Sequence, residues 1–123
     1  NLRMILNFGH TIGHAVERYF KYEKYTHGEA VSIGMVFIAE LSHRLGYCEK
    51  VVVERLRKLL EKTGLPVKLP DMEPKDVIDT VLVDKKARTN NINLILIKDI
   101  GSVVIEKFQK DRIGGYIYEM LDN

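Results

Sequence analysis

The sequence predicts a mainly α-helical domain with one short β-hairpin. The first helix, near the start of the chain, carries a narrow polar stripe on an otherwise apolar rod. A second apolar stretch, residues 30–39, has the composition of a helix that is buried nearly all round. Residues 92–97 and 103–105 are two short runs rich in branched apolar side chains, and Asp99-Ile100-Gly101 between them is typical of a hairpin turn.

Composition limits the class of protein. A length of 123 residues is enough for one domain with a single core, and 46% hydrophobic and 29% charged residues are typical of a globular chain. A net charge of +2 gives no reason to expect nucleic acid or an anionic membrane as a partner, and no apolar run is long enough to cross a bilayer. The single cysteine, Cys48, cannot form an internal disulfide, which favours a reducing, cytoplasmic location. The chain lacks an initiating Met, so we expect a fragment of a longer protein.

The polar stripe of the first helix consists of residues four, three, four and three positions apart. At about 100° per residue these side chains share a face on the order of 80° wide. Buried polar groups need partners, so the stripe predicts a cleft that holds ligand, metal or water. A pair of histidines four residues apart can also be an ordinary hydrogen-bonded part of a core. The residues of the stripe are Arg3, Asn7, His10, His14 and Glu17.

The second helix has a clear start and end. Thr26 and Glu29 form the pattern of a capping box, in which each side chain accepts a hydrogen bond from the other residue's backbone N–H. Gly46 is expected to end this helix. Gly34 permits close approach of another helix, and Gly9 and Gly13 could be its counterpart.

The rest of the chain reads as two further helices, the hairpin and a last helix. A surface helix is expected from Glu49 to Thr63, followed by Gly64 and a proline-rich linker. Pro74 fits the first turn of a short helix that runs to about residue 83, and residues 110–121 form the last helix. Asn90-Asn91 is expected to be a turn. The predicted core face of the surface helix contains Val52, Val53, Leu56, Leu59 and Leu60.

Three of the four histidines could bind a divalent metal. The spacing of His10 and His14 favours them as a pair, whereas His27, in the first turn of the buried helix, could also point into a cavity. Spacing does not decide which two of these three bind. His43 is expected in an exposed polar turn without a role. Lys85-Lys86 follows a helix end, where cations are favourable, but with Arg3 the pair could instead hold a phosphate or carboxylate.

These motifs together resemble the C-terminal domain of the 3-dehydroquinate synthase family. The resemblance rests on Arg-x-x-x-Asn-x-Gly-His-Thr-x-Gly-His from Arg3 to His14, on His-Gly-Glu-Ala-Val from His27, and on Asp84-Lys85-Lys86. It covers essentially the whole chain, and it implies the helical C-terminal domain of the dehydroquinate synthase-like fold over residues 1–123. One local departure is Asn90, where the family usually has glycine.

The resemblance also implies roles for individual residues. His10 and His27 match two ligands of a catalytic zinc, for which cobalt or another divalent metal could substitute, and the third ligand is a glutamate of the family's N-terminal domain. His14 matches a histidine that contacts substrate and transfers protons, which overrides the spacing argument. Glu17 and Glu29 match supporting positions. The substrate-binding positions are matched by Arg3, Asn7, His14 and one of Lys85 and Lys86.

The implied activity is that of a lyase in the shikimate pathway of aromatic amino acid biosynthesis. It converts a phosphorylated seven-carbon keto acid into 3-dehydroquinate and inorganic phosphate, with NAD bound mainly by the N-terminal domain and not consumed. Since that domain is absent, we expect the fragment alone to be inactive. Another sugar-phosphate cyclase, a zinc-dependent polyol dehydrogenase and an inert helical module are the alternatives. Whether the protein is a homodimer is open.

Overall fold

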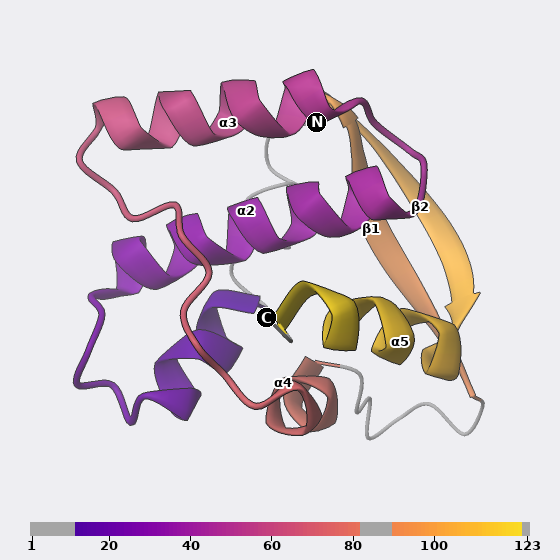
Figure 1. Cartoon of the computed structure of the whole chain (residues 1–123), viewed down its shortest axis with the longest axis horizontal. Coiled ribbons are helices and arrows are strands. Elements are labelled where there is room, and N and C mark those ends of the chain that lie inside the picture. Colours follow the sequence, from indigo (N-terminus) through magenta and orange to yellow (C-terminus); the bar gives the residue numbers. More distant parts are fainter. Residues whose placement is uncertain (1–11, 82–89, 122–123) are drawn as a thin grey trace.

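The computed structural model describes residues 12–81 and 90–121 of the chain. The predicted class, mainly helical with one β-hairpin, is confirmed. A helix over residues 12–19 comes first, and Figure 1 shows how the later elements surround α2. These elements are α2 (His27–Arg44), α3 (Lys50–Lys62), α4 (Pro74–Val81), β1 (Asn91–Asp99), β2 (Ser102–Gln109) and α5 (Lys110–Leu121).

The central helix is α2, which contacts α3, β1 and α5. The predicted capping box is present: the Thr26 side chain accepts from the Glu29 N–H at 3.2 Å, and Glu29 Oε1 accepts from the Thr26 N–H at 2.8 Å. Between residues 30 and 39 every residue except Met35 is buried, as the apolar stretch predicts. No helix within the described ranges is long and apolar enough to cross a membrane.

A buried serine joins α2 to the hairpin. The Ser42 hydroxyl donates to the carbonyl of Ile38 at 2.7 Å and accepts from the N–H of Ile97 in β1 at 2.9 Å. Ile97 lies where the strand pairing becomes irregular, between Ile97 and Asp99. The hydroxyl therefore gives the Ile97 N–H a partner inside the core, where an unpaired donor would be costly.

The surface helix α3 has a narrower core face than predicted. Val52, Val53 and Leu60 are buried and Leu56 is partly buried, but Leu59 is 50% exposed. At 100° per residue Leu59 lies about 90° from the middle of the face that Val53 and Leu56 define, so it falls at the edge of the contact. Its assignment to the core was wrong.

The hairpin is longer than predicted and begins one residue earlier. Asn91 pairs with Gln109 as the first residue of β1, so the predicted turn at Asn90-Asn91 is wrong for Asn91. Polar side chains at the end of a strand pair can lie in solvent, so a strand can extend beyond its apolar residues. The apolar run alone therefore underestimated the length of the hairpin. The predicted turn is present: Gly101 has φ 86°, and Asp99 Oδ1 accepts from the Ile100 N–H at 2.7 Å.

The two helices that close the domain agree with the predictions over their described residues. The helix α5 has the predicted bounds, and its buried residues Ile113, Ile117 and Met120 face the core. Pro74 begins α4, which contacts α5, and Gly114 of α5 lies where an added Cβ would be 3.6 Å from Ile78 Cδ1. The predicted end of α4 near residue 83 lies outside the described residues.

Replacing Ser42 by Ala should destabilise the fold. The Ile97 N–H would lose its buried acceptor, a change that typically costs about 1–3 kcal/mol of unfolding free energy. Urea unfolding measures the loss. Ser102→Ala, at an exposed position of the hairpin, is the control and should change stability by less than about 0.5 kcal/mol. Equal midpoints for the two variants would show that the Ser42 bridge contributes nothing.

Candidate functional site

Helix 12–19 packs one face against the start of α2. Ile12, Ala15 and Val16 are buried. Gly13 makes the close approach: a Cβ at this position would lie 3.2 Å from the carbonyl carbon and oxygen of Ala30 and from Cα of Val31. Gly13 therefore makes a close helix contact as predicted, but with Ala30 and Val31 and not with Gly34, the predicted counterpart. Gly9 lies outside the described residues.

A tight connection brings the chain back to α2 within a few residues. Lys21 and Tyr22 adopt left-handed backbone conformations, with φ of 56° and 61°. The Tyr22 N–H donates to the backbone carbonyl of Glu17 at 2.8 Å, which fixes the C-terminal end of helix 12–19. His27, the first residue of α2, consequently lies beside the last turn of helix 12–19.

Two histidines and one glutamate meet at this junction. Glu17 Oε1 lies 3.2 Å from His27 Nδ1, within a hydrogen bond, and 3.3 Å from His14 Nδ1. The two imidazole rings are 5.9 Å apart between centroids. The glutamate side chain is 10% exposed, whereas those of His14 and His27 are 62% and 52% exposed. A buried carboxylate thus holds two imidazoles at the surface of the domain.

The sequence predicted two members of this cluster as site residues and the third only as support. The polar stripe placed Glu17 on the same face as His14, three residues away, but could not place it beside His27, ten residues away. The other predicted site residues lie outside the described residues and stay predictions. They are Arg3, Asn7, His10, Lys85 and Lys86.

The donor set of the cluster fits part of a metal site. A histidine that binds a metal usually donates its other ring N–H to a carboxylate or carbonyl, as His27 does to Glu17. Among residues 12–81 and 90–121 there is no group of three or more His, Cys, Asp or Glu side chains placed to hold a metal ion. His27 can therefore serve as one ligand, and the described part of the chain does not complete the set.

Two other reactive side chains lie apart from this cluster. His43 is in the last turn of α2, not in an exposed turn as expected, and its Nδ1 lies 3.0 Å from the carbonyl oxygen of Cys48. Burial raises the pKa of the Cys48 thiol, and the nearby carboxylates of Glu40 and Asp99 raise it further. A raised pKa suppresses the thiolate, so Cys48 lacks the property of an activated nucleophile.

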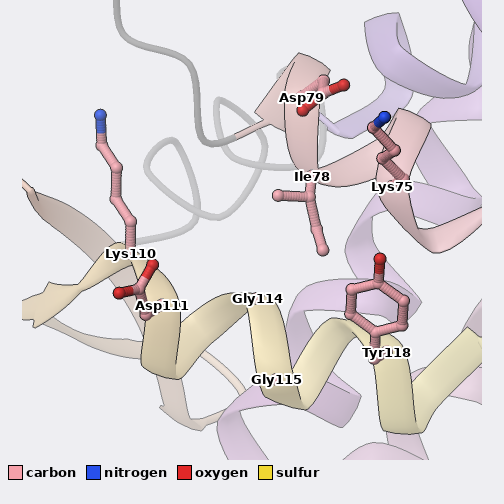
Figure 2. A pocket seen from close by; sticks show the side chains of 8 residues that line it. All are labelled: Lys75, Ile78, Asp79, Lys110, Asp111, Gly114, Gly115 and Tyr118. Carbon is pink, nitrogen blue, oxygen red and sulfur yellow. The ribbon is translucent and has the colours of Figure 1, made fainter.

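One concave feature of the described residues is a pocket between α4 and α5. Its volume is about 390 Å³, and Figure 2 shows Lys75, Asp79 and Tyr118 along its rim with Gly114 and Gly115 along the helix beneath. The charged side chains at this rim are exposed. Neither histidine of the cluster lines the pocket, so it provides no chemistry for the candidate site.

Comparison with known proteins gives consistent results. The family model described as "3-dehydroquinate synthase C-terminal" matches residues 1–87. The chain is 43% identical to the 3-dehydroquinate synthase of Thermoanaerobacter pseudethanolicus and 45% identical to that of Clostridium acetobutylicum. These alignments cover 92% and 94% of the chain but 32% of each relative. The chain therefore spans about a third of the length of the curated relatives it matches.

Solved structures with a similar arrangement include those of two synthases. A 2-deoxy-scyllo-inosose synthase, in complex with carbaglucose-6-phosphate, NAD⁺ and Co²⁺, matches with a TM-score of 0.69 and 28% identity. A 2-epi-5-epi-valiolone synthase from Streptomyces hygroscopicus subsp. jinggangensis, with NAD⁺ and Zn²⁺ bound, matches with a TM-score of 0.74 and 25% identity. Each match covers 94% of the chain and 34% or 32% of the solved chain.

The close contact at Gly13 should be intolerant of a side chain. Gly13→Ala gains about 1 kcal/mol of helix propensity but forces a methyl group against the backbone of α2, an overpacking that costs about 1–3 kcal/mol. We expect a lower melting temperature and weaker contact between Glu17 and His27. Gly115→Ala is the matched control, because nothing lies within 4 Å of an added Cβ there, and it should be neutral or stabilising. Stabilisation by both variants would contradict the predicted clash.

Proposed function

Because this chain belongs to the 3-dehydroquinate synthase family, through its match to the family's C-terminal model, we propose that it is the zinc- and substrate-binding C-terminal domain of a 3-dehydroquinate synthase. The proposed reaction eliminates phosphate from a phosphorylated seven-carbon keto acid and closes the ring of 3-dehydroquinate. The observation that carries the proposal is the family match over residues 1–87, whose residues include both histidines of the cluster. The contact of those histidines with a shared carboxylate supports it.

The metal would be held by His27 and His10, with a third ligand from an N-terminal domain. When bound, zinc supplies Lewis-acid polarisation of a substrate hydroxyl and NAD supplies its reversible oxidation. The solved relatives that carry NAD⁺ with Co²⁺ or Zn²⁺ support this pair of cofactors. We propose the shikimate pathway as the setting, because 3-dehydroquinate, the product of the proposed reaction, belongs to that pathway.

Within the chain, His14 is the proposed proton-transfer residue. Its Nδ1 faces Glu17, so a proton of the substrate would be taken up or released at Nε2, on the other side of the ring. Arg3, Asn7 and one of Lys85 and Lys86 would hold the anionic groups of the substrate. Charged donors fix such groups in one orientation, which lowers the entropic part of the barrier.

The exposure of the two histidines supports a site that is completed by another domain. His14 and His27 lie at the surface of this domain although their carboxylate partner is buried. A catalytic zinc usually has three protein ligands, and substrate phosphates and NAD need further contacts. We therefore propose that an N-terminal NAD-binding domain of the same enzyme covers this face. The isolated chain would then be inactive.

A related sugar-phosphate cyclase is the second candidate, because the solved neighbours are synthases of other products, 2-deoxy-scyllo-inosose and 2-epi-5-epi-valiolone. The greater identity to relatives named 3-dehydroquinate synthase favours the first candidate. The complete protein, supplied with zinc, NAD and the seven-carbon keto-acid phosphate, should release 3-dehydroquinate and phosphate in equal amounts. The chain alone should release neither. If the complete protein turned over a different sugar phosphate but did not turn over the seven-carbon keto-acid phosphate, the synthase would be rejected in favour of another cyclase.

Replacing His14 by Ala in the complete enzyme should separate proton transfer from metal binding. We expect kcat to fall by about 10²–10⁴-fold, the usual contribution of a general acid or base, while zinc content stays at the wild-type level. His27→Ala should lose zinc as well as activity. His43→Ala, distant from the cluster, is the control and should keep both. Zinc loss in His14→Ala, measured by elemental analysis, would instead make His14 a ligand.

A further inference from the structure

We propose that Glu17 is the positioning residue of the site: its carboxylate holds His27 and His14 with Nδ1 protonated and Nε2 directed away from it, toward metal and substrate. This inference rests on the proposed function only for the naming of metal and substrate. The geometric claim, that one buried carboxylate sets the orientation and tautomer of two imidazoles, rests on the described residues alone.

The carboxylate is built into the domain. Glu17 follows the buried residue Val16 in helix 12–19, and its backbone carbonyl accepts the N–H of Tyr22. Its side chain is among the few buried charged or polar side chains of the described residues. A buried carboxylate needs hydrogen-bond donors. His27 Nδ1 lies within a hydrogen bond of Oε1 at 3.2 Å, and His14 Nδ1 lies 3.3 Å from the same oxygen as an ion-pair contact.

The chemistry follows from what a carboxylate can do. An ionised carboxylate only accepts hydrogen bonds, so a neutral imidazole beside it carries its proton on Nδ1 and its lone pair on Nε2. That tautomer can bind a metal or take up a proton at Nε2. Without Glu17 the rings would rotate more freely and would populate both tautomers, and part of the population would present a protonated Nε2.

A purely structural role for Glu17 is the competing explanation. An anionic group near the first turn of α2 also stabilises the helix through its dipole. Loss of that effect would lower the stability of the fold and leave the histidine tautomers and the metal affinity unchanged. The experiment must therefore measure properties of the rings themselves.

Glu17→Gln in the complete enzyme is the test, since glutamine keeps the shape of the side chain and removes its charge. In the metal-free protein, ¹⁵N spectra of labelled histidine should show the Nδ1–H tautomer for two wild-type histidines and a mixed population in the variant. Zinc affinity, from competition with a chelator, should fall by about 10–100-fold, the usual effect of removing a carboxylate partner of a ligand histidine. The matched control is Glu23→Gln, which removes the same charge from an exposed position in the connection between the two helices.

Unchanged tautomers and unchanged zinc affinity in Glu17→Gln would overturn the proposal, even if the variant melted at a lower temperature. Should the glutamine variant not fold, Glu17→Asp keeps the charge but withdraws it by one methylene, and it should change the same two readouts. Failure of the proposed function is a separate outcome. An enzyme that makes no 3-dehydroquinate, yet shows the tautomer change in Glu17→Gln, would refute the function and leave the role of Glu17 established.

Discussion

The contact between helix 12–19 and the first turn of α2 is the constraint on which the candidate site depends. It favours glycine at position 13, because an added Cβ would lie only 3.2 Å from the backbone of Ala30 and Val31. It also requires the left-handed conformation of Lys21 and Tyr22, which returns the chain over a short distance. Together these features place residues 14, 17 and 27 side by side on two helices whose packing is otherwise apolar.

Packing in the core holds α2 in the position that this contact needs. The helix is buried on nearly all sides, and the hairpin is fastened to it by Ser42 as well as by apolar packing. Polar side chains of α2 reach the surface at both ends of the helix, and at the first turn the capping box fixes its start at His27. A site built on the rigid ends of packed helices is positioned more accurately than one built on a loop.

The cluster combines a buried hydrogen-bond acceptor, the Glu17 carboxylate, with two exposed imidazoles. This combination explains why its side chains are held in place and are still accessible. Burial limits the rotamers of Glu17, whereas exposure leaves His14 and His27 accessible to groups from outside the domain. By contrast, the pocket between α4 and α5 has charged residues only at its rim and no buried polar group that could fix a ligand. Chemistry is therefore better supported at the helix junction than in this pocket.

The sequence by itself determined the features that depend on local interactions. The capping box at Thr26 and Glu29, the bounds of α5 and the turn at Gly101 each involve residues a few positions apart, whose conformations follow from hydrogen bonding and steric preference. Motif resemblance, confirmed by the family match, supplied the family. Contacts between distant residues were decided only by the tertiary structure. Periodicity alone could not show how wide the interface of α3 is, and so that Leu59 at its edge is exposed, or that Ser42 accepts a hydrogen bond from Ile97 in β1. Nor could it show that Glu17, read as support, is the shared partner of His14 and His27, because that contact exists only once two helices have packed.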